Sequence, residues 1–152
     1  MKVSDVMSAP AITVPLGTSL SEAARQMDAH GIGSLLVVEG GALRGIVTDR
    51  DLAMRGLGCG LDREAQVDAV MSPRVITVNV SDDIHVAYRT FRGSGVRRLP
   101  VLDGYRVVGM LTVDDLLLDV FQRLADLLGP VAWSILEEEP GPPPADEPPY
   151  EM

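Results

Sequence analysis

Two short stretches of the chain place a hydroxyl and a carboxylate three residues apart, first at Thr48 and Asp51 and again at Thr112 and Asp115. A Thr at the start of a helix presents its hydroxyl and free backbone amides to an anion, and the helix dipole favours negative charge there. An Asp one turn later lies on the same face and can accept two hydrogen bonds from a diol. Both stretches are candidate ligand sites. The same spacing also fits a capping box, in which Thr and Asp satisfy only their own helix.

An internal repeat relates the two stretches. Val6-Met7-Ser8 recurs as Val70-Met71-Ser72, and Ile12-Thr13-Val14 recurs as Ile76-Thr77-Val78, both at an offset of 64 residues. Between residues 6 and 52, 16 of 47 positions are identical to their partner, where chance would give about one match in fifteen to twenty. The chain is therefore a duplicated unit that carries the Thr and Asp motif twice.

Each copy predicts the element order β-α-β-β-α. A β-branched run (11–14 and 75–78) precedes a helix that starts at Ser or Asp and stops at Gly31 or Gly95. Two apolar runs around a Gly turn predict a hairpin, and a final helix starts near Thr48 or Thr112. One unit of this size buries little surface alone. We therefore expect an α/β (α+β) fold of two tandem repeats, related by a pseudo-twofold axis and packed through their sheets.

The chain divides into four segments on this interpretation. Residues 1–60 are repeat 1, 61–128 are repeat 2, 129–136 form a C-terminal helical extension, and 137–152 form an acidic, Pro-rich tail that we expect to be disordered.

The tandem β-α-β-β-α units, with Gly45-Ile46-Val47-Thr48-Asp49-Arg50-Asp51 matched by the segment from Gly109 to Asp115, resemble the CBS domain (cystathionine β-synthase domain) family. Arg97-Arg98-Leu99-Pro100-Val101 adds to this resemblance, which covers residues 1 to about 120. It implies a stand-alone CBS pair, or Bateman module. In that family, the cleft between the repeats binds adenosine-containing ligands such as AMP, ADP, ATP, S-adenosylmethionine or NAD(H).

The resemblance also implies roles for individual residues. The Thr and Asp of each motif would hold ribose and phosphate, Arg97 and Arg98 would receive phosphate, and the backbone of 11–13 and 75–77 would hold the adenine edge between apolar walls. The expected ligand-binding residues are Ala11, Thr13, Ile32, Thr48, Asp51, Val75, Thr77, Val96, Arg97, Arg98, Pro100, Thr112 and Asp115.

Repeat 1 departs from the family pattern at the Arg pair, where it has Gly33 and Ser34. We therefore expect at most one strong phosphate site, and we group Arg97 and Arg98 with Asp115 in it. The alternative is that the two arginines pair with acidic neighbours on the surface.

The charge excludes one class of partner. The chain has 13 Lys and Arg against 22 Asp and Glu, a net charge of -9, and six of the acids lie with six prolines in residues 137–152. An acidic chain is a poor binder of nucleic-acid polymers. The tail itself fits either a solubilising end or a Pro-rich ligand for a partner.

Few other residues could do chemistry. Cys59 is the one cysteine and cannot form an internal disulfide, and no signal-peptide pattern is present, so we expect a cytoplasmic protein. His30 and His85 lack metal-ligand spacing, and no catalytic triad, paired catalytic carboxylates or P-loop occurs. We expect no metal, no required cofactor and no enzymatic activity.

The last predicted helix, from Asp114 to a break at Gly129-Pro130, is more apolar than one half-buried helix requires. Asp119, Arg123 and Asp126 exclude a membrane span, so the surplus predicts a homodimer contact. We expect a regulatory module that passes its signal to a separate, unidentified effector protein. The alternative is a ligand-free interaction or stress-response scaffold of the same fold.

Overall fold

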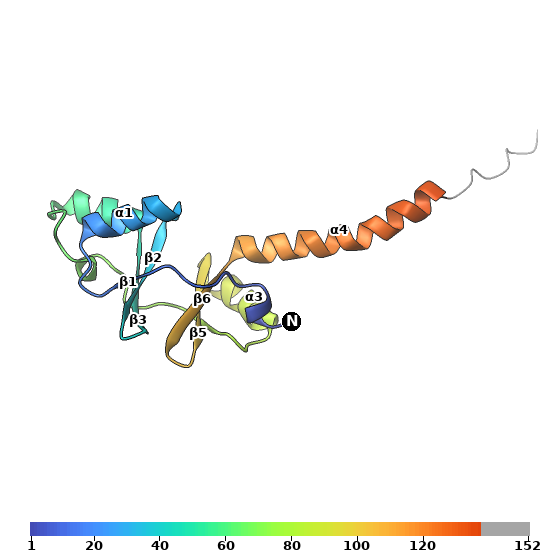
Figure 1. Cartoon of the computed structure of the whole chain (residues 1–152), viewed down its shortest axis with the longest axis horizontal. Helices are drawn as coiled ribbons and strands as arrows, with labels where there is room; N and C mark the ends of the chain where they lie inside the picture. The colour runs from blue at the N-terminus through green and yellow to red at the C-terminus, as the bar shows by residue number, and fades with distance from the viewer. Residues whose placement is uncertain (138–152) are drawn as a thin grey trace, which may run out of the picture. The chain divides into compact units, whose positions relative to one another are not determined.

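The computed structural model describes residues 1–137 and divides into two units, Met1–Leu117 with both repeats and a second unit that begins at Leu118 inside the last helix. Each repeat has the predicted element order (Figure 1). The first contains β1 (Thr13–Pro15), α1 (Leu20–His30), β2 (Ser34–Glu39), β3 (Ala42–Thr48) and α2 (Asp49–Asp51). The second contains β4 (Val78–Asn79), α3 (Ile84–Ser94), β5 (Arg98–Asp103), β6 (Arg106–Thr112) and α4 (Val113–Glu137).

The helices α1 and α3 begin and end at the same positions of the two repeats. Ser19 Oγ accepts a hydrogen bond of 3.1 Å from the Glu22 N–H, and an Asp83 carboxylate oxygen accepts one of 2.9 Å from the His85 N–H. Gly31 and Gly95 follow the last turns with φ of 61° and 70°, a left-handed conformation that costs a glycine little. These caps confirm the predicted helix limits.

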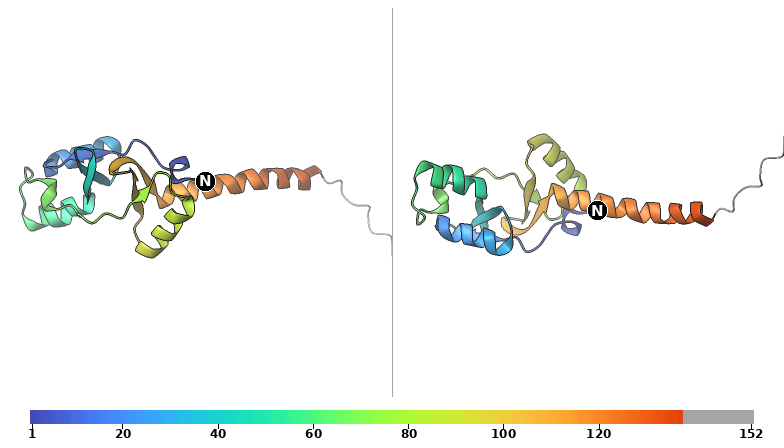
Figure 2. Two further views of the ribbon diagram at one scale, coloured as in Figure 1. Left: turned by 90° about the horizontal axis from the view of Figure 1, so that it is seen from below. Right: turned by 90° about the horizontal axis from the view of Figure 1, so that it is seen from above.

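The strands form one six-stranded sheet in the order β1-β2-β3-β6-β5-β4. Within each repeat the first strand pairs in parallel with the second, and the hairpin strands pair antiparallel. The halves join where Ala42 of β3 pairs antiparallel with Arg106 of β6. These two residues are 64 positions apart, so the pseudo-twofold axis passes between them. Figure 2 shows α1 in blue and α3 in yellow-green on separate halves of the first unit.

Each repeat has its own hydrophobic core, which lies between its strands and α1 in repeat 1 and between its strands and α3 in repeat 2. Leu35 and Val37 of β2 are fully buried in the first core with Ala23 of α1, and Leu99 and Val101 occupy the same places in the second. The residues between them, Leu36 and Pro100, are also fully buried. Because neighbours along a strand point to opposite faces, these two lie on the side of the sheet away from the helices, where the repeats pack together.

The opening segment of each repeat packs onto the other repeat. Val3 is fully buried in the core of repeat 2, and its N–H donates to Asp82 O at 2.9 Å. Its counterpart Val67 is fully buried in the core of repeat 1 and donates to Thr18 O at 2.8 Å. The division of the sequence at residue 60 therefore does not coincide with the division between the two cores.

Gly45 and Gly109 allow this exchange because the crossing segments lie against them. A Cβ on Gly45 would lie 2.7 Å from Met71 Sδ and 2.9 Å from Ser72 O. A Cβ on Gly109 would lie 2.8 Å from both Met7 Sδ and Ser8 O. No side chain fits at these distances, so the glycine of each Thr and Asp motif is a packing requirement.

The last helices of the repeats differ. After α2, repeat 1 continues as a π-helical turn, Leu52–Gly56, and a 3-10 turn, Leu57–Cys59. In repeat 2, α4 is one helix of 25 residues, so the expected break at Gly129-Pro130 is absent. Pro130 removes one backbone N–H from the helix ladder, but the turns on either side remain helical.

Two further sequence predictions concern the C-terminal region. The expected disordered tail, apart from Glu137 at the end of α4, lies outside the described residues. Among the residues that are described, no helix is long and apolar enough to cross a membrane.

Candidate functional site

Both Thr and Asp motifs form complete capping boxes. Thr48 Oγ1 accepts from the Asp51 N–H at 3.1 Å, and Asp51 Oδ2 accepts from the Thr48 N–H at 2.9 Å. Thr112 and Asp115 make the same two hydrogen bonds at 3.1 and 2.9 Å. The capping interpretation is therefore correct at both motifs, and any ligand must bind to atoms that the caps leave open.

The second carboxylate oxygen distinguishes the two aspartates. Asp51 Oδ1 lies 3.9 Å from Arg55 Nε in an ion pair. Asp115 Oδ1 has no hydrogen-bond or ion-pair partner among residues 1–130. Asp115 therefore keeps an acceptor for a ligand hydroxyl while it caps its helix.

A first cavity, which we call cleft A, lies between the repeats and includes Asp115. Its volume is about 210 Å³. Repeat 1 supplies most of its apolar lining, and repeat 2 supplies Met110, Thr112 and Asp115. Its lining residues are Ser8, Pro10, Ala11, Ile12, Ile32, Ser34, Met110, Thr112 and Asp115.

A second cavity, cleft B, is the pseudosymmetric counterpart of cleft A. Its volume is about 300 Å³. Most of its lining residues lie 64 positions after a lining residue of cleft A. Ile46 lies 64 positions before its counterpart, Met110. Its lining residues are Ile46, Arg74, Val75, Ile76, Val96, Arg97 and Arg98.

The structure brings most of the predicted site residues to the clefts. Four of them line cleft A and four line cleft B, in the sets just given. Thr77 lines a separate cavity near Tyr105, together with Val75. Thr13, Thr48, Asp51 and Pro100 line neither cleft, and Pro100 is fully buried in β5.

The expected grouping of the Arg pair with Asp115 is wrong. Arg97 and Arg98 line cleft B, whereas Asp115 lines cleft A. The reason is the antiparallel junction at Ala42 and Arg106, which sets the motif of each repeat beside the opening strand of the other. In repeat 2, the Arg pair and Asp115 therefore line different cavities.

Several lining residues were not predicted from the sequence, and Arg74 matters most among them. It places a third arginine in cleft B, where cleft A has Pro10. Ile46 and Met110 were also missed as lining residues. An alignment of the two repeats could have indicated Arg74, because this basic residue corresponds to the uncharged Pro10 in repeat 1.

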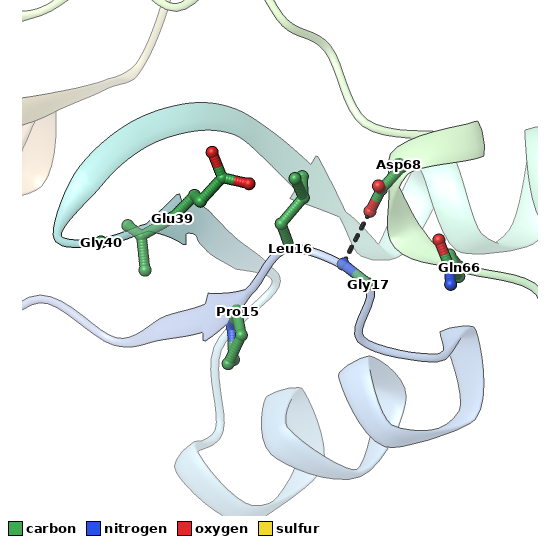
Figure 3. Close-up of a pocket in the computed structure, with 8 residues that line it drawn as sticks. Pro15, Leu16, Gly17, Glu39, Gly40, Gln66 and Asp68 are labelled. Atoms are coloured by element: carbon green, nitrogen blue, oxygen red, sulfur yellow. Dashed lines mark hydrogen bonds between the residues drawn. The ribbon is translucent and has the colours of Figure 1, made fainter.

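A further cavity, of about 480 Å³, is larger than either cleft but contains no predicted site residue. Figure 3 shows it beside β1 and β2, with Asp68 Oδ1 accepting a 2.9 Å hydrogen bond from the Gly17 N–H. The sheet strands of repeat 2 contribute no residue to its lining. Because clefts A and B lie at the junction of the repeats and share one pattern of lining positions, they are the stronger candidates despite their smaller volumes.

The remaining reactive side chains stand apart from the clefts. Cys59 is exposed, and its Sγ lies 3.6 Å from Met54 O. His30 Nδ1 lies 2.9 Å from Gln26 O. Within residues 1–137, no group of three or more His, Cys, Asp or Glu side chains is placed to hold a metal ion.

Comparison with known proteins gives a consistent result. The family model described as "CBS domain" matches residues 3–58 and again 67–121. The CBS domain-containing protein YhcV of Bacillus subtilis is 35% identical over 114 residues, which are 75% of this chain and 81% of that protein.

Two solved structures are similar over the same region. The CBS domain pair of protein MJ0100, in complex with 5'-methylthioadenosine and S-adenosyl-L-methionine, has 29% identity and a TM-score of 0.70, with 81% of this chain and 98% of that one covered. Hypoxic Response Protein I, with two coordinated zinc ions, has 30% identity and a TM-score of 0.70, with 76% and 96% covered.

Proposed function

The chain belongs to the CBS domain family, and on this basis we propose that it is a non-enzymatic regulatory module that binds an adenosine-containing ligand between its two repeats. The observation that carries the proposal is the set of residues that line cleft A. Its apolar walls, Ala11, Ile12 and Ile32, suit a base, and the open oxygen of Asp115 suits a ribose hydroxyl. The complex of protein MJ0100 with two adenosyl compounds supports this class of ligand.

A ligand in such a cleft can act as a signal because residues from both repeats touch it. Binding then favours one relative packing of the repeats over another, and the coupling equals the difference in affinity between the two states. We propose that the signal passes to a separate effector protein.

The exposed face of α4 supports a homodimer. Six apolar side chains that begin at Leu118 are each 47–68% exposed: Leu118, Val120, Phe121, Leu124, Leu127 and Leu128. They recur at three- and four-residue spacing, as helices that pair with a copy of themselves require. Helices that lie on anionic lipid carry a basic polar face, but the last basic residue is Arg123, which pairs with Asp119 at 3.1 Å. A second copy of the chain therefore fits this face better than a membrane surface does.

A thermal-shift panel tests the ligand class. The panel contains AMP, ADP, ATP, S-adenosylmethionine, 5'-methylthioadenosine and NADH. A ligand at about 100 times its Kd stabilises the folded state by about 2.7 kcal/mol, which raises Tm by several degrees in a chain of this size. Asp115→Ala should weaken the shift given by whichever compound occupies cleft A. Asp51→Ala is the matched control, because it removes the same capping box from a residue that lines neither cleft.

The alternative function is a ligand-free interaction scaffold. The observation that favours it is that both capping boxes are complete without a ligand. Absence of a shift with every compound would support the scaffold and contradict the proposed binding function.

A further inference from the structure

We propose that the two clefts select adenosyl ligands by their charge: cleft B takes an anionic ligand that carries two or more phosphates, and cleft A takes one that carries none. This inference rests on the proposed function and assigns a ligand class to each of its two cavities. It follows from differences between side chains at positions that the pseudosymmetry makes equivalent.

Three arginines and no acidic residue line cleft B. Arg74, Arg97 and Arg98 all line it, and all three are exposed. Within residues 1–137, none of them forms an ion pair. Three guanidinium groups around one cavity repel one another, and an anion placed among them removes that repulsion.

The arginines reach the cavity from two parts of the chain. Arg74 comes from the segment before β4, whereas Arg97 immediately precedes β5 and Arg98 is its first residue. A single phosphate can be held from one side, but cations at two borders of a cavity favour a group with several anionic oxygens. Val75 and Val96 supply the apolar walls for a base beside it.

Cleft A lacks every one of these cations. Pro10 stands where cleft B has Arg74, and Ser34 stands where it has Arg98. At the third position Gly33 replaces Arg97, and the Asp49 carboxylate fills the space: its Oδ2 lies 3.0 Å from the point where a Gly33 Cβ would be. With Asp115 in the same cavity, the charge near cleft A is negative and repels a phosphate.

The backbone around these positions is the same in both repeats. The Asp49 N–H donates to Gly33 O at 2.9 Å, and the Val113 N–H donates to Arg97 O at 3.1 Å. The charge difference is therefore carried by side chains on a common scaffold. Gly33 and Asp49 in one repeat correspond to Arg97 and Val113 in the other, so the pair can be exchanged by substitution.

Isothermal titration calorimetry with ADP, inorganic pyrophosphate and 5'-methylthioadenosine tests the selection. Wild type should bind ADP at one site. Arg74→Gln and Arg97→Gln should each weaken ADP binding by about tenfold or more, because each removes a charge-assisted contact. Both variants should leave 5'-methylthioadenosine binding unchanged. Arg92→Gln is the matched control, since Arg92 is exposed on α3 and lines neither cleft.

The double variant Gly33→Arg with Asp49→Val tests the same idea by gain of function. It gives repeat 1 the residue pair of repeat 2. Because it supplies only one of the three cations of cleft B, it should raise the affinity of cleft A for pyrophosphate and ADP without reaching that of cleft B, and a melting curve without ligand checks that the variant folds. ADP binding that resists both arginine substitutions, or 5'-methylthioadenosine binding that depends on them, would overturn the charge selection and leave the adenosyl function standing.

Pyrophosphate separates the two hypotheses. If it binds in an arginine-dependent way while no adenosyl compound binds, cleft B is an anion site and the adenosyl function fails. If neither pyrophosphate nor any adenosyl compound binds wild type, both proposals are wrong.

Discussion

Repeats 1 and 2 have the same residue where close backbone packing requires it, but they differ at several of the positions that line the clefts. Gly45 and Gly109 are the same residue because a crossing segment leaves no space for a Cβ at either. Ser34 and Arg98 occupy equivalent places in β2 and β5 but border different cavities. Packing therefore determines the residues of the backbone scaffold that the two repeats share. The side chains that line each cleft can differ in charge.

The repeats also differ in the segments that follow their capping boxes. The largest predicted effect, on the oligomeric state, concerns these segments. Repeat 2 continues into α4, with Phe121 65% exposed, while repeat 1 ends in short turns with the equivalent Leu57 80% exposed. If α4 alone pairs two copies, Phe121→Glu should convert a dimer into a monomer, because it buries a charge in an apolar contact. Sedimentation equilibrium measures the outcome.

Two further variants serve as controls for the Phe121→Glu experiment. Gln122→Glu adds the same charge one residue away, on the polar side of α4, and should leave the dimer intact. Leu57→Glu should also leave it intact. Dissociation by Leu57→Glu would show that both repeats supply the interface, and a monomeric wild type would refute the dimer altogether.

The second prediction concerns the feature that the repeats share. Gly45→Ala and Gly109→Ala should each lower the free energy of unfolding by about 2–3 kcal/mol, because the new Cβ collides with a sulfur atom and a backbone carbonyl. Urea unfolding measures both. Gly93→Ala is the control: nothing lies within 4 Å of its Cβ position in α3, so it should raise stability by about 1 kcal/mol. A tolerated alanine at position 45 or 109 would contradict the close crossing.

The smallest predicted effect distinguishes the two helix caps. The hydrogen bond from the His85 N–H lowers the pKa of Asp83 below its ordinary value of 3.8. Because the folded-state pKa is lowered, the ionised cap stabilises the fold fully above pH 3.8 and loses that contribution as the pH falls through the lowered value. The Tm advantage of wild type over Asp83→Asn should therefore be present at neutral pH and vanish in strong acid.

Ser19 provides the comparison for that titration, because the cap of repeat 1 carries no charge. The Tm difference between wild type and Ser19→Asn should stay constant over the same pH range. An equal pH dependence for the two caps would mean that the loss in acid arises elsewhere in the fold.

Local features of the fold could be predicted from the sequence because each depends on neighbouring residues. The limits of α1 and α3 follow from Ser19, Asp83 and the glycines that close each helix. The continuation of α4 through Pro130 could not be predicted from local propensity, which places a break there.

Several residues that line the clefts could be predicted from the sequence, but which of them share a cavity could not. Thr112, Asp115 and the Arg pair line the clefts, whereas Thr48 and Asp51 line neither of them. Which of the lining residues share a cavity depends on pairings between distant residues, such as Ser8 with Met110 and Ile46 with Ser72, and no local pattern reports such pairings. Arg74 has no motif of its own, and only its position opposite Pro10 gives it meaning.

The exchange of opening segments gives this chain the topology of a domain-swapped dimer joined into one polypeptide. Val3 belongs to the second core and Val67 to the first, so a single repeat expressed alone would lack the segment that completes it. Two such single repeats could recover the fold only by trading their first residues with each other. Linkage in tandem makes that trade intramolecular and therefore independent of protein concentration. It also lets the two halves of one symmetric assembly carry different side chains.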